Sequence, residues 1–377
     1  MRATASLTLI ALVLLTLSLG AGPAQAASGS EVETPIPKRV YDRAERIVQL
    51  PDRRRMNFRC RGHGSPTVIL ESGFGAGSQA WGRVQPRIAG VTRVCAYDRA
   101  GYGFSDPGPL PRDGAAIARD LDQALRAAAI RGPFIVVGHS AGGLYARLFA
   151  ARRRSDVAGL VLVDSSAPFQ DRRLSAMLGP GAGGVEGIRQ RVSRCLEAAK
   201  RTPPHADTNL PTECAPLAAV PHDRLIAGSE GAWRTQLSEL DTLFAQTSTE
   251  VDRIGTLLQD FPLIVLTASA TGTPAGPGRP GPQAWEQLHA ELAASSRRGE
   301  QRIVLSSHLM MNDRPEIVAG AILELVAASR RAPALHERVS APGASRAVCR
   351  PFDVAWSFRS VASHTTTRGN GFRSAAP

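Results

Sequence analysis

Short apolar runs alternate with helical patterns along most of the chain. The apolar runs cover residues 67–71, 93–97, 134–137, 160–163, 263–266 and 302–305. Ile117, Leu121 and Leu125 recur at four-residue spacing and predict an amphipathic helix over about 114–129. Further helices are predicted over about 141–153 and around Ile322. Continuously apolar strands separated by helices are typical of a parallel sheet with both faces covered, so we predict an α/β fold.

This alternation has one interruption and ends before the C-terminus. Residues 166–260 carry helical patterns punctuated by Gly and Pro and lack strand signals, so we expect an inserted helical cap there. Residues 27–45 are polar and are predicted to be a lead-in. Residues 332–377 are rich in Ser, Arg, Ala and Thr without periodicity, and we expect a disordered tail. The remaining span, 46–331, is predicted to be a single folded domain that contains this cap.

The N-terminus has the pattern of an export signal. Arg2 supplies a positive charge, residues 7–19 form an apolar run, and residues 24–26 read Ala-Gln-Ala. The apolar run is shorter than the roughly 20 residues that cross a bilayer. We therefore expect a signal peptide over residues 1–26, cleaved after Ala26, and a protein located in the periplasm, in the cell envelope or outside the cell.

The net charge and the cysteine spacing indicate which partners and ligands to expect. The 45 basic and 33 acidic residues give a formal charge of +12, but the arginines are scattered and no nucleic-acid motif accompanies them. We expect no nucleic-acid partner, and weak association with an anionic cell envelope. In an exported chain, cysteines favour disulfides over metal ligands, and none of the five has zinc-site spacing. We expect no metal and no cofactor.

A G-x-S-x-G motif provides the candidate nucleophile. Residues 138–142 read Gly-His-Ser-Ala-Gly, between a buried strand and a helix, which is the context of a nucleophile elbow. Side chains at positions 138 and 142 would collide in so tight a turn. Ser140 is therefore the predicted nucleophile. The alternative is a glycine-rich turn that merely opens a helix.

His308 is the candidate base. It follows the last strand, where a loop can bring it over the carboxyl edge of the sheet. Asp313 and Pro315 downstream predict a helix that Asp313 caps. His139 adjoins the nucleophile, but its side chain is expected to point elsewhere, so it is not assigned as the base.

The acid is harder to choose. The loop over residues 271–282 follows the strand at 263–266 and contains no carboxylate. Asp164 ends the strand next along from the elbow strand and is the predicted acid. Glu286 is the second choice. The alternative for Asp164 is a loop-capping residue bonded to backbone amides.

An oxyanion hole needs two backbone donors. Ala141 directly follows the nucleophile and supplies one amide. The turn over residues 72–77 supplies the other, for which we favour Phe74 over Gly75. The alternative for this glycine-rich turn is a flexible loop.

Taken together, these segments resemble the α/β-hydrolase superfamily, and in particular its secreted esterase-like and lipase-like members. The resemblance covers about residues 46–328. The residues that carry it are 71–75 (Glu-Ser-Gly-Phe-Gly), 97–106 (Tyr-Asp-Arg-Ala-Gly-Tyr-Gly-Phe-Ser-Asp), 138–142, 163–164 and His308. The chain departs from the family pattern at Ser72, where a His is common, and at the acid site after the penultimate strand, which is empty.

The resemblance implies an eight-stranded, mostly parallel sheet and hydrolysis of an ester-like bond in a small acyl substrate. Ser140 would attack, His308 would transfer the proton, and Asp164 would orient the imidazole. An amidase or peptidase, a C–C bond hydrolase and a non-catalytic binding module remain alternatives. The Ser at position 140 argues against a nucleophilic Asp, as found in dehalogenase and epoxide hydrolase relatives.

The resemblance also suggests how the cysteines pair. The second and fourth strands of this fold are neighbours, so Cys60 and Cys95 are expected to form a disulfide. Cys195 and Cys214 bracket a Pro-rich stretch of the predicted cap and are expected to pair there. Cys349 is left over.

Overall fold

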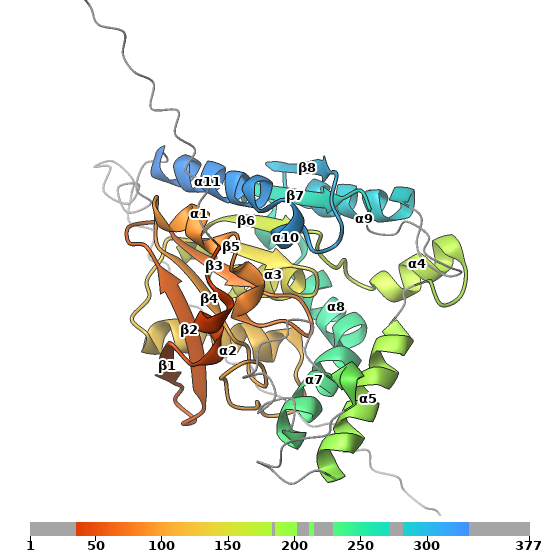
Figure 1. Ribbon diagram of the computed structural model, residues 1–377. Coiled ribbons are helices and arrows are strands. Elements are labelled where there is room, and N and C mark those ends of the chain that lie inside the picture. The colour runs from red at the N-terminus through yellow and green to blue at the C-terminus, as the bar shows by residue number, and fades with distance from the viewer. Residues whose placement is uncertain (1–34, 183–184, 202–210, 215–228, 271–281, 332–377) are drawn as a thin grey trace, which may run out of the picture. The chain divides into compact units, whose positions relative to one another are not determined.

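A single mixed sheet organises the computed structural model, which describes residues 35–182, 185–201, 211–214, 229–270 and 282–331 (Figure 1). Within these residues the strand order is β1-β2-β4-β3-β5-β6-β7-β8. The strands are β1 Arg46–Gln49, β2 Arg55–Arg61, β3 Thr67–Glu71, β4 Val94–Tyr97, β5 Phe134–His139, β6 Val157–Val163, β7 Leu263–Ala268 and β8 Gly299–Val304. The predicted signal peptide, the predicted tail and Cys349 lie outside the described residues.

Most of the sheet is parallel. β1 pairs antiparallel with β2, and β2 pairs antiparallel with β4, whereas all the other pairings are parallel. The predicted eight-stranded α/β fold is therefore confirmed. The carboxyl ends of parallel strands meet at one edge of a sheet, and ligands of such folds bind there.

Helices connect the strands. The α-helices are α1 Gln85–Ala89, α2 Gly114–Ala127, α3 Gly142–Arg152, α4 Gln170–Leu178, α5 Val185–Arg201, α7 Glu230–Thr242, α8 Ser248–Asp252, α9 Pro282–Ala294, α10 Met310–Asp313 and α11 Pro315–Arg331. Single-turn 3₁₀ or π segments are η1 Lys38–Asp42, η2 Ser78–Trp81, η3 Arg154–Asp156, η4 Thr212–Cys214, η5 Leu243–Thr247 and η6 Gly255–Leu258. Asp113 caps α2, because its carboxylate accepts the Ala116 amide at 2.8 Å.

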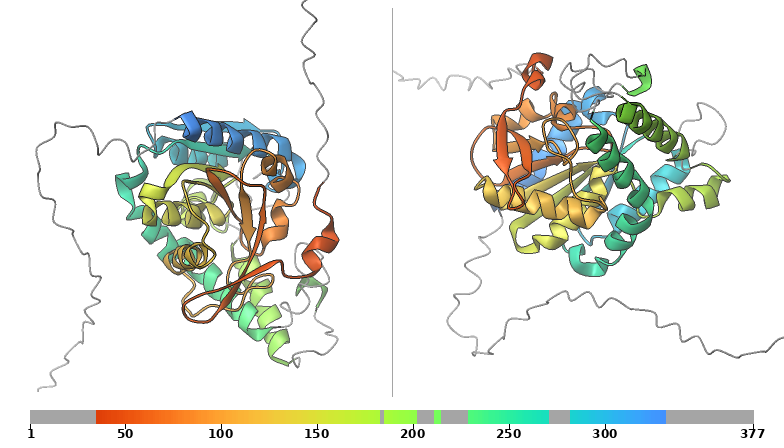
Figure 2. Two further views of the ribbon diagram at one scale, coloured as in Figure 1. Left: turned by 90° about the vertical axis from the view of Figure 1, so that its left-hand side faces the viewer. Right: turned by 90° about the horizontal axis from the view of Figure 1, so that it is seen from below.

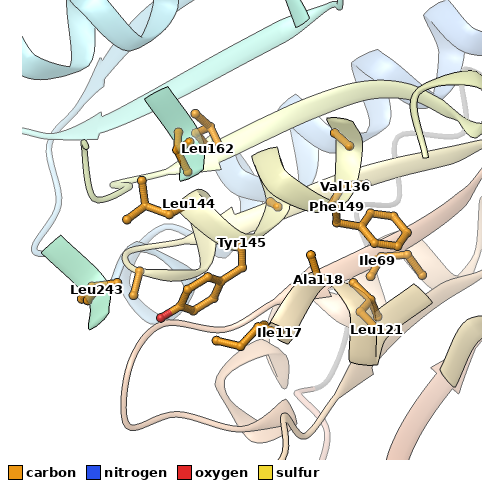
Figure 3. Close-up of a cluster of buried hydrophobic side chains, with 14 of the residues drawn as sticks. Ile69, Ile117, Ala118, Leu121, Val136, Leu144, Tyr145, Phe149, Leu162 and Leu243 are labelled. Carbon is orange, nitrogen blue, oxygen red and sulfur yellow. The ribbon is translucent and has the colours of Figure 1, made fainter. Parts of the chain in front are cut away.

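Alternating strand residues build two cores, one on each face of the sheet. On one face, Ile69 and Val136 pack against α2, α3 and α9. Figure 3 shows part of this cluster, with Tyr145 and Phe149 of α3 lying toward α2. On the other face, Val68 and neighbouring strand residues pack against α1 and α11. Because both faces are buried, the strands read as continuous apolar runs in the sequence.

Among the residues that the structure describes, the segment between β6 and β7 contains helices joined by turns and loops, and no strand. It holds α4, α5, η4, α7, η5, α8 and η6. Figure 2 shows α5 and α7 side by side, and Arg189 of α5 donates to Asp241 of α7 at 2.7 Å. Across the described residues, no helix is both long and apolar enough to cross a membrane.

Two disulfides pair the four cysteines expected from the sequence. Cys60 and Cys95 face each other across the antiparallel β2–β4 ladder and are bonded. Cys195 of α5 is bonded to Cys214 of η4. The first bridge closes a span of 35 residues within the sheet, and the second closes 19 residues outside it.

We expect loss of the Cys60–Cys95 bridge to lower the free energy of unfolding by roughly 2–4 kcal/mol, because the unfolded chain gains conformational entropy. Urea unfolding of the Cys60→Ala/Cys95→Ala double variant measures this loss. The Cys195→Ala/Cys214→Ala double variant is the matched comparison and should lose less, since its loop is shorter. Peptide mapping without reduction that found free thiols at these positions would contradict the prediction.

Candidate active site

The G-x-S-x-G motif forms a sharp turn between β5 and α3. β5 ends at His139, α3 begins at Gly142, and Ser140 lies between them with φ of +52°. A Cβ on Gly138 would lie 2.5 Å from the Gly142 carbonyl oxygen, and a Cβ on Gly142 would lie 2.5 Å from the Ser72 carbonyl oxygen. Both positions therefore require glycine. This is the strained strand–turn–helix geometry that exposes a nucleophile.

Asp164 lies beside Ser140 because the two strands are in register. β5 and β6 are parallel neighbours, and His139 pairs with Val163. Ser140 directly follows His139 and Asp164 directly follows Val163, so both residues lie at the same edge of the sheet. Asp164 also has positive φ (+42°), and it is fully buried.

His308 reaches this edge from the loop between β8 and α10. Its Nδ1 lies 2.6 Å from Asp164 Oδ2, while its side chain is 40% exposed. A carboxylate only accepts hydrogen bonds, so Nδ1 carries a proton and donates a hydrogen bond to Asp164. In the neutral imidazole, Nε2 of His308 is then the acceptor nitrogen, as a general base requires.

Two donors outside the sequence motifs fix the second oxygen of Asp164. The Trp285 Nε1–H and the Ala268 amide each donate to Asp164 Oδ1 at 2.8 Å. Trp285 lies on α9, and its ring is 4.7 Å from that of His289. With Oδ1 held by these donors, Oδ2 is turned toward His308. No local sequence signal points to Trp285, because its contact with Asp164 spans 121 residues.

Glu286, the second choice for the acid, lies on α9 next to Trp285. No hydrogen bond or ion pair joins its carboxylate to His308 among the residues that the structure describes. Its carbonyl oxygen accepts a hydrogen bond from the Gln301 side chain at 3.0 Å. Of the two carboxylates, the structure therefore brings Asp164 to the imidazole.

The predicted cap of the last helix is wrong. α11 begins at Pro315 as expected, but the residue before it is Arg314. Asp313 ends α10, and its Oδ2 accepts hydrogen bonds from the Ser307 amide at 3.0 Å and the Ser307 hydroxyl at 2.5 Å. These hydrogen bonds lower the pKa of Asp313. Asp313 thus stabilises the turn that carries His308.

His139, which is not assigned as the base, contacts this turn from the elbow strand. Its Nε2 lies 2.9 Å from the His308 carbonyl oxygen, and the two imidazole rings are 4.7 Å apart. Burial, with a smaller contribution from His308, lowers the pKa of His139 to about 3. His139 is therefore neutral and donates from Nε2, so it supports the His308 loop.

This buried histidine makes the folded protein sensitive to acid. An unfolded histidine binds its proton near pH 6.5, whereas His139 in the folded state does so only near pH 3. Between these values the unfolded state holds more protons, so stability decreases as pH falls, by at most about 1.4 kcal/mol per pH unit.

We expect His139→Gln, which retains a donor, to reduce the loss of stability between pH 6.5 and pH 4. Urea unfolding at a series of pH values measures this slope. The exposed His63→Gln variant is the control and should leave the slope unchanged. An identical slope in His139→Gln and wild type would contradict the assignment of a neutral His139.

The loop after β3 passes directly against the nucleophile. A Cβ on Gly73 would lie 3.0 Å from the Ser140 Cβ and 2.9 Å from His139 Nδ1. The Ser72 hydroxyl donates to the Gly77 carbonyl at 2.8 Å and accepts from Trp81 Nε1 at 3.0 Å. Ser72 therefore closes the loop on itself and ties it to η2.

The backbone amides predicted to form the oxyanion hole make no hydrogen bond within the described residues. Among the described residues, neither the Phe74 amide nor the Ala141 amide donates a hydrogen bond. The Gly75 amide, the second choice, lies 3.4 Å from the Tyr102 hydroxyl. No hydrogen bond joins the Ser140 hydroxyl to His308 within the described part of the chain. Such bonds often form only once substrate is bound.

A metal site is a different possibility for clustered His and Asp side chains. In the described ranges, no group of three or more His, Cys, Asp or Glu side chains is arranged to hold a metal ion. Ser140 and Asp164 instead lie at the same edge of the sheet, and His308 is hydrogen-bonded to Asp164 there.

Known proteins share this fold. Residues 66–183 match the family model described as alpha/beta hydrolase fold. The uncharacterized protein YqjL of Bacillus subtilis (strain 168) is 23% identical over 282 residues, which cover 74% of this chain and 91% of that protein.

Two solved structures illustrate the likeness. The protein lip1 from Acinetobacter baumannii AYE aligns with a TM-score of 0.57 at 18% identity, covering 78% of this chain and 94% of that one. The enol-lactonase from Burkholderia xenovorans LB400 aligns with a TM-score of 0.51 at 15% identity, covering 75% and 100%. At these identities the likeness establishes the fold.

Proposed function

Since this chain belongs to the α/β-hydrolase superfamily, we propose that it is a serine hydrolase that cleaves a carboxylic ester through an acyl-enzyme. The observation that carries the proposal is the 2.6 Å contact between His308 Nδ1 and the buried Asp164 carboxylate, at the sheet edge where Ser140 forms the elbow. A serine at its ordinary pKa is a weak nucleophile, and a base with a fixed tautomer is what activates it.

In the proposed mechanism, the Ser140 oxygen attacks the carbonyl carbon while its proton passes to His308 Nε2. The negative charge that develops on the carbonyl oxygen is stabilised by the Phe74 and Ala141 amides. The C–O bond of the ester then breaks, and the leaving alkoxide takes the proton from His308. Water repeats the sequence on the acyl-enzyme, with His308 again as base, and releases the acid and Ser140.

Asp164 stabilises the imidazolium that forms in each half of the reaction. Because it is fully buried and accepts hydrogen bonds from Trp285, Ala268 and His308, its charge is held by fixed donors. This preorganisation lowers the cost of separating charge in the transition state.

We favour an ester over an amide as the substrate. The enol-lactonase with the same fold acts on a lactone, which is a cyclic ester. An amide leaving group must be protonated as it departs, whereas a phenol or alcohol leaves more readily. Amidase or peptidase activity would use the same three side chains and is the alternative outcome of the substrate test.

We also propose that the protein works outside the cytoplasm and that the helical segment between β6 and β7 acts as a cap. Two disulfides in the described residues are compatible with an oxidising compartment. Where the structure describes it, the segment over residues 166–260 contains helices and no strand, and helix α7 contacts the active-site side of the sheet through Glu239.

A fluorophosphonate probe followed by an ester panel tests the activity. We expect covalent labelling at Ser140, and hydrolysis of p-nitrophenyl esters of increasing acyl chain length. Matched p-nitroanilides should be cleaved far more slowly. Faster cleavage of the anilides would indicate an amidase. Absence of both labelling and hydrolysis would point to a binding module and contradict the proposal.

A further inference from the structure

A buried arginine holds the loop that leads to Phe74. Arg99 lies just after β4, and its side chain is 2% exposed. Its Nη1 donates to the Ser72 carbonyl oxygen at 2.5 Å, and its Nη2 donates to the Gly73 carbonyl oxygen at 2.9 Å. The rigid fork of the guanidinium thus fixes two successive carbonyl groups, which a single ammonium cannot do.

The second of these carbonyls belongs to the same peptide unit as the Phe74 amide. A trans peptide is planar, and its C=O and N–H point in opposite directions. Binding of the Gly73 oxygen by Arg99 therefore fixes the direction of the Phe74 N–H. A charged donor on the C=O also polarises the peptide and strengthens its N–H as a donor.

Two buried carboxylates from distant parts of the chain bind the same guanidinium. Glu71, at the end of β3, accepts from Arg99 Nη1 at 2.8 Å. Glu239, on α7, accepts from Arg99 Nη2 at 3.0 Å and from the Tyr145 hydroxyl at 3.1 Å. Both carboxylate side chains are 1% exposed. The contact with Glu239 joins the segment between β6 and β7 to the loop beside the nucleophile.

The carboxylates keep the guanidinium charged. Burial alone would lower the pKa of Arg99, but Glu239 and Glu71 outweigh burial and raise it above its ordinary value. A buried cation that loses a carboxylate partner is poorly compensated and shifts toward other acceptors. Neutralising Glu239 would therefore loosen Arg99 while Glu71 still holds it.

We propose that Arg99 is a positioning residue for the oxyanion hole, and that Glu239 makes its position depend on how α7 packs against the loop. The proposal rests on the proposed function, because the Phe74 amide acts only if acyl chemistry takes place at Ser140. The oxyanion donor is aligned while α7 is in contact with Arg99 and is misaligned when that contact is lost.

Two substitutions test this coupling. Glu239→Gln keeps the size and an acceptor oxygen but removes the charge, and Arg99→Lys keeps the charge but binds one carbonyl at most. We expect kcat for a p-nitrophenyl ester to fall roughly 10-fold in Glu239→Gln and further in Arg99→Lys, up to the 10²–10³-fold loss of a complete oxyanion donor. KM should change by less than about threefold, since ground-state binding is unaffected. If Arg99→Lys does not fold, Glu239→Gln alone decides the test.

Phenylboronic acid distinguishes positioning from general damage. It bonds to the serine oxygen as a tetrahedral adduct, and one boron-bound oxygen then occupies the oxyanion site. We expect its inhibition constant to rise by about the factor by which kcat/KM falls, because both report the same transition-state contact. A lower kcat with unchanged inhibition by the boronic acid would overturn the proposal.

Asp120→Asn is the matched control. Asp120 lies on α2, its side chain is 6% exposed, and it binds Arg54 at 2.7 Å and Arg112 at 2.9 Å without touching the loop. We expect both Asp120→Asn and Glu239→Gln to lower the melting temperature, but only Glu239→Gln to change kcat and boronic acid inhibition. Equal loss of kcat in both would make Glu239 a structural residue and overturn the proposal.

Labelling of the wild-type protein separates the two proposals. A wild-type chain that neither reacts with a fluorophosphonate nor hydrolyses esters overturns the proposed function. A reactive wild type, with Glu239→Gln and Arg99→Lys both as active as wild type, overturns only the positioning of the oxyanion loop.

Discussion

Ser140→Ala is expected to lower kcat for a p-nitrophenyl ester by about 10⁴–10⁶-fold, because the variant has no oxygen with which to form the acyl-enzyme. The residual rate would come from substrate binding and the oxyanion donors. Alanine has a Cβ like serine and meets the same strain at φ of +52°, so the turn should form in both proteins. Steady-state kinetics and the extent of fluorophosphonate labelling measure the effect.

Ser165→Ala is the matched control for this variant. Ser165 follows Asp164, and its hydroxyl is buried and donates to the Ser166 carbonyl at 2.9 Å. The Ser165→Ala substitution removes a hydroxyl from the same edge of the sheet and leaves the nucleophile in place. We expect most of the activity to remain in Ser165→Ala. Retention of a tenth of wild-type activity in Ser140→Ala would refute the nucleophile assignment.

The sequence revealed the parts of the site that depend on local geometry. The strand–turn–helix around Ser140 is encoded within ten residues, since two glycines are required where a Cβ would strike backbone atoms. The buried strands could be predicted from continuous apolar runs in the sequence, because helices cover both faces of the sheet. Asp164 could be ranked first because neighbouring parallel strands end at the same edge, which is a consequence of topology alone.

Contacts between segments that are distant in the sequence could not be predicted from the sequence. Trp285 reaches Asp164 across 121 residues, and Glu239 reaches Arg99 across 140. In the local sequence, Trp285 resembles an ordinary core residue of an amphipathic helix, and Glu239 resembles a residue of its exposed polar face. The cap predicted for Asp313 is wrong for a different, local reason: an acidic residue two positions before Pro315 is typical of a helix cap, but the Asp313 carboxylate accepts hydrogen bonds from Ser307 in the preceding turn.

Asp164→Asn is expected to lower kcat by about 10⁴-fold through the tautomer of His308. The Trp285 Nε1–H and the Ala268 amide both donate to the position of Oδ1, so the asparagine oxygen must stay there. Its NH₂ group then faces His308 Nδ1 and donates to it. His308 must in turn carry its proton on Nε2, where it can no longer accept the proton of Ser140.

The pH dependence and two further variants test this mechanism. Trp285→Phe removes one of the donors that orient Asp164 but leaves its charge, so we expect a fall in kcat of about 10-fold, well below that of Asp164→Asn. Glu286→Gln, on the same helix as Trp285, should leave kcat within about twofold, because its carboxylate has no described contact with His308.

The Asp164→Asn variant should recover activity at high pH, where hydroxide can take the serine proton in place of the imidazole. If Glu286→Gln instead produced the larger loss, Asp164 would be a structural residue of the turn and Glu286 would be the acid.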